Sequence, residues 1–249
     1  MNQISAPQLP DMTAVWQETL NWQPTLEQQV LFQQLFELII QFNQQLNLTR
    51  LTEPEEFWEK HLWDSLRGIS FLLSEKNPLS PGTKFIDIGT GGGFPGIPLA
   101  VIFPESSVTL LDSTRKKITA LTTILEELKI NNTIPWVGRA EALGQHPKHR
   151  ESYDFALLRA VAPPSVSAEY ALPLLKVGGT AILYRGHWTP EEEQQLISAV
   201  KQLGGVLESV DGFNTPLTQS IRHCLYLKKV RPTAKQYPRA TGIPGQKPL

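Results

Sequence analysis

Residues 85–96 read FIDIGTGGGFPG, and this stretch decides the fold class. An apolar run that contains one acid, Asp87, leads into five glycines within the eight residues 89–96. Glycines at such a place let the backbone turn tightly and approach a ligand, and a following helix offers free backbone N–H groups. The stretch therefore predicts a strand, a ligand-binding loop and a helix, rather than a turn with glycines only for packing.

Short apolar runs alternate with amphipathic stretches beyond this loop. Repeated strand–helix–strand units imply right-handed crossovers and a parallel sheet covered on both faces. The runs 206–213 and 221–228 have no helix between them and predict an antiparallel hairpin at the sheet edge. The other predicted strands are 84–88, 108–111, 133–137, 153–158 and 180–184, and the predicted helices are 96–103, 115–129, 164–175 and 190–203. The fold class is thus α/β, with a Rossmann-like, mostly parallel seven-stranded sheet.

Helical patterns precede the sheet. Thr25 and Gln28 form a capping-box pair, and apolar residues recur at helical spacing over 26–46. A second helix is predicted over 52–73, with acidic residues in its first turn. We expect four segments: an N-terminal extension at 1–24, a helical segment packed on the core at 25–82, a Rossmann-like domain at 83–230, and an extended basic Pro/Gly-rich tail at 231–249.

The composition excludes several classes of protein. Of the 249 residues 41% are hydrophobic and 19% charged, which excludes a disordered or collagen-like chain. The single cysteine, Cys224, excludes an intramolecular disulfide framework and is expected to be buried in a strand. The histidines show no ligand spacing, so no metal is expected. We find neither a membrane span nor a signal peptide, and we expect a soluble cytoplasmic protein.

The charge is distributed unevenly. Residues 212–249 carry seven basic and no acidic groups, whereas residues 1–211 sum to −8. Such asymmetry is the electrostatic pattern of a segment that contacts phosphates, although a solvated tail without a partner has the same composition.

Two cofactor interpretations compete at the glycine loop. Gly91 to Gly96 fits the dinucleotide pattern G-x-G-x-x-G, with Asp112 at the distance of a ribose-binding acid. However, the Asp87 carboxylate would repel a diphosphate and attract the ammonium and sulfonium of S-adenosylmethionine. The order D-x-G-x-G-x-G is also the opening motif of Rossmann-like methyltransferases. Asp112 would accept ribose hydroxyls, cap the helix that begins near Arg115, or do both.

Several further motifs complete a family pattern. They are Asn47-Leu48-Thr49, Lys60-His61-Leu62-Trp63-Asp64-Ser65-Leu66, the glycine loop with its two prolines, Leu110-Leu111-Asp112-Ser113, Arg139-Ala140-Glu141, Arg159-Ala160, and the ending Tyr237-Pro-Arg-Ala-Thr-Gly-Ile-Pro-Gly-Gln-Lys-Pro-Leu249. From about Leu26 to Leu249 the chain resembles the bacterial small-subunit ribosomal RNA methyltransferase G family, also called glucose-inhibited division protein B. That resemblance implies a class I S-adenosylmethionine-dependent fold and methylation of guanine N7 in 16S rRNA, with the rRNA or the small subunit as partner. The sequence shows no clear self-complementary patch, so a monomer is the default expectation.

The resemblance and the loop motif together give a set of candidate cofactor-binding residues. These are Asp87, Gly89, Gly91, Phe94, Asp112, Ser113, Thr114, Ala140, Glu141 and Arg159. One position departs from the family pattern: Arg185 stands where many members have lysine, which puts its role in doubt because arginine is a planar fork.

Guanine N7 carries an in-plane lone pair, so catalysis needs orientation rather than a base. Asp64, beside His61, is the candidate that shapes the base pocket; the alternative is a surface charge or a cap. Arg159 is the second catalytic candidate and would hold a phosphate or guanine O6/N7; the alternative is an ion pair with Asp154 or Glu141.

RNA contacts are expected from the basic residues Arg115, Lys116, Arg185, Arg231, Lys235, Arg239 and Lys247. Phe94 or Trp63 would stack on the guanine, although Trp63 fits the core better. Other functions stay open: an NAD(P)-dependent oxidoreductase that uses the 91–96 loop, a non-catalytic RNA-binding assembly factor, or a methyltransferase for a small molecule.

Overall fold

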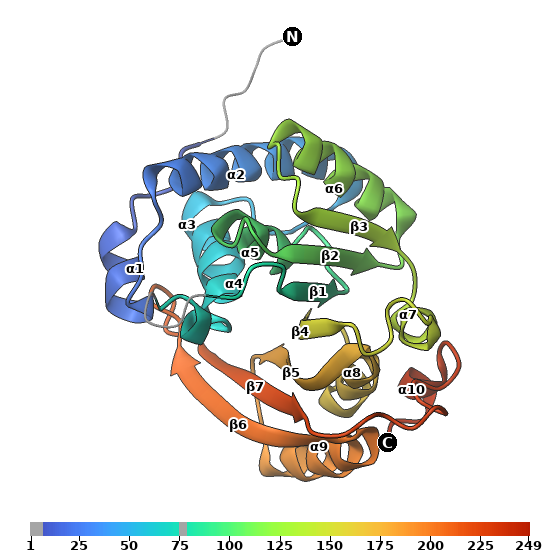
Figure 1. Cartoon of the computed structure of the whole chain (residues 1–249). Coiled ribbons are helices and arrows are strands. Elements are labelled where there is room, and N and C mark those ends of the chain that lie inside the picture. The colour runs from blue at the N-terminus through green and yellow to red at the C-terminus, as the bar shows by residue number, and fades with distance from the viewer. Residues whose placement is uncertain (1–6, 75–78) are drawn as a thin grey trace.

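Seven strands form one sheet in the order β3-β2-β1-β4-β5-β7-β6 (Figure 1). Strands β1 to β5 are parallel, and β7 is antiparallel to both β5 and β6. The strands are β1 (Lys84–Ile88), β2 (Ser107–Asp112), β3 (Thr133–Val137), β4 (Tyr153–Arg159), β5 (Leu175–Arg185), β6 (Gly205–Asn214) and β7 (Ile221–Lys229). The predicted fold class and the terminal hairpin are confirmed.

This computed structural model describes residues 7–74 and 79–249. The first six residues of the predicted N-terminal extension therefore lie outside the described residues. In the described part of the chain no helix has both the length and the apolar character needed to cross a bilayer.

Successive side chains along each strand point alternately into two hydrophobic cores, one on each face of the sheet. Phe85, Leu110 and Leu157 point into one core with α5 (Gly96–Ile102) and α6 (Arg115–Glu127). Side chains one residue along the strands, such as Ile86, Leu111 and Leu158, point into the other. That core is closed by α7 (Ala140–Gln145), α8 (Pro164–Ala171), a 3-10 turn (Leu172–Leu174) and α9 (Pro190–Leu203).

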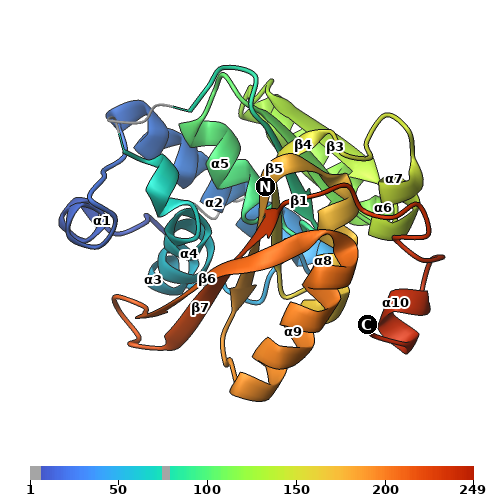
Figure 2. The same cartoon turned by 60° about the horizontal axis from the view of Figure 1, so that its bottom comes forward.

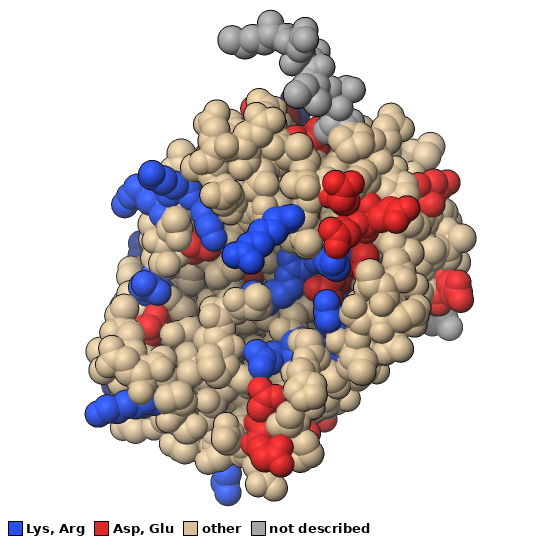
Figure 3. Space-filling model, turned by 180° about the vertical axis from the view of Figure 1, so that it is seen from behind, with Lys and Arg blue, Asp and Glu red and all other residues tan. Residues whose placement is uncertain are grey.

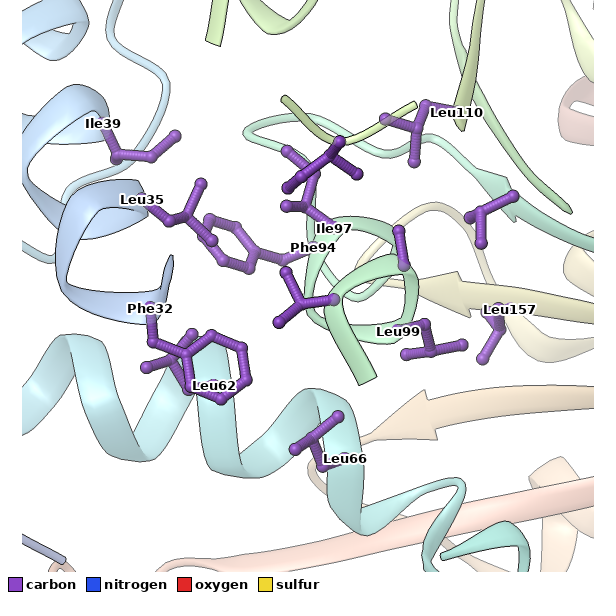
Figure 4. Close-up of a cluster of buried hydrophobic side chains, with 14 of the residues drawn as sticks. Phe32, Leu35, Ile39, Leu62, Leu66, Phe94, Ile97, Leu99, Leu110 and Leu157 are labelled. Carbon is purple, nitrogen blue, oxygen red and sulfur yellow. The ribbon is translucent and has the colours of Figure 1, made fainter. Parts of the chain in front are cut away.

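The N-terminal helices belong to the first of these cores. Helix α2 (Leu26–Leu46) begins with the predicted capping box, in which Thr25 and Gln28 bond reciprocally. Its apolar face, with Phe32, Leu35 and Ile39, packs near the glycine loop and α5 (Figure 4). Figure 2 shows α1 to α5 gathered on one side of the sheet and α8 and α9 on the other. The sheet and the N-terminal helices thus share buried contacts rather than forming separate cores.

The second predicted helix is not regular. It consists of α3 (Pro54–Phe57), a π-helical turn η1 (Trp58–Trp63), α4 (Asp64–Arg67) and a 3-10 turn (Ser70–Leu72). The hydrogen-bond pattern of a π turn leaves no signature in apolar periodicity, so the sequence did not predict it. Such turns are frequent at functional sites, and this one carries three of the residues considered below.

The two ends of the chain also differ from expectation. Helix α1 (Thr13–Leu20) was not predicted; it forms because Trp16 and Leu20 are buried against the core. Residues 231–249, predicted as an extended tail, instead lie along α7 and α8 and end in the short helix α10 (Ile243–Gln246). Tyr237 and Leu249 pack on the second core. The buried positions of Trp63 and Cys224 confirm the expectations made for them.

Candidate active site

The glycine loop turns the chain sharply after β1. Gly89 has φ +73°, and a Cβ there would lie 2.7 Å from Val161 Cγ2. A Cβ at Gly96 would overlap Leu110 Cδ2. Both positions therefore exclude a side chain. At Gly89 the backbone conformation and the contact with Val161 exclude it, and at Gly96 the contact with Leu110 does. The loop brings backbone close to the carboxyl ends of β1 and β2.

Asp87 holds this loop together from inside. Its Oδ2 accepts hydrogen bonds from Thr90 Oγ1 at 2.6 Å and from the backbone N–H of Gly96 at 2.8 Å. Its side chain is fully buried, and Oδ1 has no partner in the described structure. Burial raises the pKa of the Asp87 carboxyl to about 6, although the two hydrogen bonds oppose that rise.

Asp112 fixes the loop from the end of β2. Its Oδ2 accepts from Gly91 N at 3.0 Å and its Oδ1 from Thr114 N at 2.8 Å. A carboxylate oxygen accepts more than one hydrogen bond, so ligand hydroxyls still find acceptors here. Asp112 lines a cavity of about 100 Å³ together with Gly89, Ser113, Ala140 and Glu141. These five of the ten candidate cofactor-binding residues meet in one place.

The other candidates lie outside that small cavity. Gly91 donates to Asp112, Thr114 occupies the N-cap position of α6 without a side-chain capping bond, and Asp87 lies beneath the loop. Phe94 is buried, and its ring stacks on His61 with centroids 4.3 Å apart and planes 7° from parallel. Arg159 lines a second, larger cavity.

The larger cavity measures about 840 Å³ and lies at the carboxyl ends of β4 and β5. Four cations line it, and Figure 3 shows a face on which Lys and Arg side chains gather around a hollow. Its charged and polar lining consists of Glu59, Lys60, His61, Asp64, Arg159, Tyr184, Arg185, His187, Thr189, Glu192, Thr215 and Arg222. Both residues predicted as catalytic, Asp64 and Arg159, therefore face the same space.

Arg159 is fixed by the N-terminal helices. Its Nη1 donates to the Lys60 carbonyl at 2.6 Å and to Asp64 Oδ2 at 3.1 Å, and its Nη2 donates to His61 Nδ1 at 3.1 Å. The alternative partners considered for Arg159 were wrong, because Asp154 pairs with Lys176 and Glu141 accepts from Gly242 N. Within the described residues two N–H groups of Arg159, on Nε and Nη2, have no acceptor.

His61 connects this network to the glycine loop. Its Nδ1 accepts from the Arg159 guanidinium, so Nε2 carries the proton that Thr49 Oγ1 accepts at 2.6 Å. Burial lowers the pKa of His61 well below its ordinary value, and the charge of Arg159 lowers it further. His61 is therefore neutral, and it orients Arg159 without adding positive charge.

Arg185 lies at the far wall of the larger cavity. Its Nη2 donates to Glu192 Oε1 at 3.0 Å, and Glu192 also closes the capping box at the start of α9. The Arg185 Nε is buried without a hydrogen-bond partner among the described residues. An unsatisfied buried donor is costly, so this side chain is suited to an acceptor that a ligand brings.

The remaining predicted RNA contacts are distributed over two regions. Arg115 and Lys116 are exposed at the start of α6, and Lys235 and Lys247 are exposed in the C-terminal segment. Arg231 donates to the Lys201 carbonyl at 2.6 Å, and Arg239 forms an ion pair with Glu169.

Sequence reasoning missed several residues that line the larger cavity. Lys60 and Arg222 project into it from η1 and β7, and no motif marked them as a pair. Glu59 is fully buried, and it accepts hydrogen bonds from Leu217 N and Thr218 N in the β6–β7 turn. Only the tertiary structure shows these contacts, because the partners lie far apart in the sequence.

The chain is similar to proteins of one known family. The family model described as rRNA small subunit methyltransferase G matches residues 28–224. The Ribosomal RNA small subunit methyltransferase G of Nostoc punctiforme is 62% identical over 97% of this chain and 98% of its own length. That of Trichodesmium erythraeum is 58% identical over 100% of this chain and 98% of its own length. A solved S-adenosylmethionine-dependent methyltransferase from Aquifex aeolicus has the same fold, with TM-score 0.54, 15% identity, and coverage of 74% of this chain and 97% of that one.

Proposed function

The chain belongs to the rRNA small subunit methyltransferase G family, and from that premise we propose that it methylates N7 of a guanine in small-subunit ribosomal RNA. The cofactor of this methyltransferase is S-adenosylmethionine. One observation carries the proposal: the glycine loop and Asp112 border a small cavity at the sheet edge, next to a larger cavity lined by cations.

The residues around the small cavity suit the nucleoside part of the cofactor. Asp112 offers carboxylate oxygens for ribose hydroxyls, while Ile88, Leu111 and Val161 supply apolar contacts for a purine. A side chain at position 89 would collide with Val161. Because Gly89 has none, a ligand can approach the backbone there. When bound, S-adenosylmethionine supplies an electrophilic methyl group on a positively charged sulfur.

Asp64 and Arg159 are proposed to orient the guanine. The N7 lone pair is the nucleophile, so a hydrogen bond to N7 would block the reaction. The two unused N–H groups of Arg159 are therefore assigned to O6 of the base or to the cofactor carboxylate. The purine gains positive charge during transfer, and the Asp64 carboxylate opposes that charge in a largely buried site.

Cations around the larger cavity are proposed to hold the RNA backbone. Lys60, Arg185 and Arg222 line its wall, and Arg115 and Lys116 extend the positive surface at α6. Phosphate contacts of this kind fix the position of the RNA and weaken as salt is raised. We place this monomeric enzyme with its ribosomal substrate in the cytoplasm.

Methyl transfer from labelled S-adenosylmethionine tests the proposal. Unmodified small-subunit rRNA and assembled small subunits are offered as separate acceptors, and the labelled nucleoside is identified after digestion. The proposal expects 7-methylguanosine from one or both acceptors. Label in any other nucleoside would contradict the assignment of guanine N7.

A further inference from the structure

The C-terminal strap, residues 231–249, carries four of the seven residues that sequence analysis assigned to RNA. Two of these four bind other parts of the protein. The Arg231 Nη2 donates to the Lys201 carbonyl, and Arg239 binds Glu169 of α8. Arg231, Lys235 and Lys247 are exposed, whereas Arg239 is half-buried. The basic character of the strap thus does not by itself make it an RNA-binding arm.

Arg239 binds a carboxylate that is removed from solvent. The Glu169 side chain is 1% exposed. Its Oε1 accepts from Arg239 N at 2.8 Å and Nε at 2.9 Å, and its Oε2 accepts from Arg239 Nη2 at 2.6 Å. In the described structure Arg239 makes every hydrogen bond that Glu169 accepts. A buried carboxylate without a partner is strongly unfavourable, so Arg239 cannot leave Glu169 for a phosphate without a large cost.

A second attachment reaches the cofactor cavity itself. Glu141, in the first turn of α7, is 4% exposed and lines the same cavity as Asp112. Its Oε1 accepts a hydrogen bond from Gly242 N at 2.9 Å. Gly242 has φ +87°, a conformation that favours glycine, so the turn before α10 is shaped to present this N–H. A residue of the strap therefore fixes a residue of the cavity wall.

The strap also holds the other end of α7. Gln145 Nε2 donates to the Pro238 carbonyl at 2.6 Å. The Pro238 ring packs against Gly144, where a Cβ would lie 2.7 Å from Pro238 Cγ. Helix α7 has six residues, too few for a helix that is stable alone. Its position depends on these contacts at both ends, which Figure 1 shows as α10 and the strap lying beside α7 and α8.

We propose that the strap is a clamp on the adenosine side of the cofactor cavity, and that Arg239 and Glu169 are positioning residues for the cofactor. Glu169 precedes Tyr170, which lines that cavity. The Arg239–Glu169 pair therefore attaches the strap to α8, and the Gly242–Glu141 bond attaches it to α7. The clamp rests on the proposed function, since it acts on the cofactor of that activity. It assigns the strap to cofactor binding rather than to RNA binding.

Arg239→Lys in the full chain separates the two roles. Lysine keeps the positive charge that a phosphate contact needs, but it cannot form the bidentate fork that Glu169 receives. We expect the Kd and the KM for S-adenosylmethionine to rise about tenfold or more, as for other residues that act through a ligand-contacting neighbour. RNA affinity and its salt dependence, measured with small-subunit rRNA, stay at the wild-type values.

Two further variants keep the test decisive. Gly144→Ala displaces Pro238 without changing any charge and is expected to weaken cofactor binding in the same way. Lys247→Ala removes an exposed charge of the strap and leaves cofactor affinity unchanged. Circular dichroism is used to check that each variant is folded. If Arg239→Lys does not fold, the test rests on Gly144→Ala.

The outcomes distinguish the clamp from the function on which it rests. Wild-type cofactor affinity in folded Arg239→Lys and Gly144→Ala overturns the clamp, as does a loss confined to RNA affinity. Failure of the wild-type protein to bind S-adenosylmethionine would instead overturn the proposed function.

Discussion

Asp64 and Arg159 are 95 residues apart in the sequence, yet Asp64 Oδ2 and Arg159 Nη1 lie 3.1 Å apart in the larger cavity. Their side chains are 12% and 16% exposed, so the pair is largely shielded from water. The contact joins the π-helical region before the sheet to the end of β4. The N-terminal helices therefore supply part of the candidate active site as well as part of the core.

Asp64→Asn tests this pair. The amide keeps the shape of the side chain but loses its charge, so Arg159 is less firmly oriented and the positive charge of the methylated purine is not opposed. We expect the rate of methyl transfer in single turnovers to fall on the order of 10²-fold. Glu56→Gln is the control, since its i,i+4 pair with Lys60 is partly exposed and worth about 0.3–0.5 kcal/mol. An equal effect of both variants would contradict a specific role of Asp64.

Gly91→Ala tests the glycine loop. Gly91 has φ +56°, and a Cβ there would have no neighbouring atom nearer than 3.9 Å, so alanine costs about 1–2 kcal/mol of backbone strain without a clash. Gly82 has φ +75° and open space around it, away from both cavities. Gly82→Ala is therefore a matched control. Both variants should lose similar stability in urea unfolding, whereas only Gly91→Ala should lose affinity for S-adenosylmethionine in calorimetry.

The pKa of Asp87 predicts a pH-dependent stability. Burial, opposed by hydrogen bonds from Thr90 and Gly96, raises this pKa from 3.8 to about 6. Between those values the native state binds more protons than the unfolded state, so this carboxyl contributes stability below pH 4 that is lost as pH rises through 6. Relative to the wild type, Asp87→Asn should gain roughly 3 kcal/mol in free energy of unfolding between pH 4 and pH 7. A difference that stays constant with pH would show that Asp87 is not the titrating group.

Arg185→Ala tests the cationic wall of the larger cavity. Loss of one phosphate contact should reduce the slope of log affinity against log salt by about 0.7–0.9. Lys176 is the matched control, because it lies at the opposite end of the same strand and also forms one ion pair, with Asp154. Filter binding with small-subunit rRNA at several salt concentrations compares the two. A slope that changes in Lys176→Ala but not in Arg185→Ala would place the RNA elsewhere.

The sequence predicted what local patterns determine. The glycine loop, the alternation of strands and helices and the terminal hairpin are encoded by residues close in the chain, and the structure confirms them. Asp112 was a candidate because of its spacing from the glycine loop, and it lines the small cavity in the structure. These features need no knowledge of distant contacts.

Contacts between distant segments could not be predicted in this way. The partner of Arg159 is Asp64, whereas Asp154 lies at the opposite end of β4 and pairs with Lys176. Likewise, the prolines and glycines of the strap indicated an extended tail, but Arg239 meets a buried carboxylate 70 residues away. Composition gives the charge of a segment and not the identity of its partner.

The nucleoside that receives the methyl group decides whether this protein methylates guanine N7. Wild-type protein is incubated with labelled S-adenosylmethionine and unmodified small-subunit rRNA, free and assembled, beside the Asp87→Ala variant. We expect labelled 7-methylguanosine with the wild type and none with the variant, whose glycine loop lacks the carboxylate that holds Thr90 and Gly96. Label in another nucleoside, or an unchanged yield of 7-methylguanosine from Asp87→Ala, would contradict this expectation.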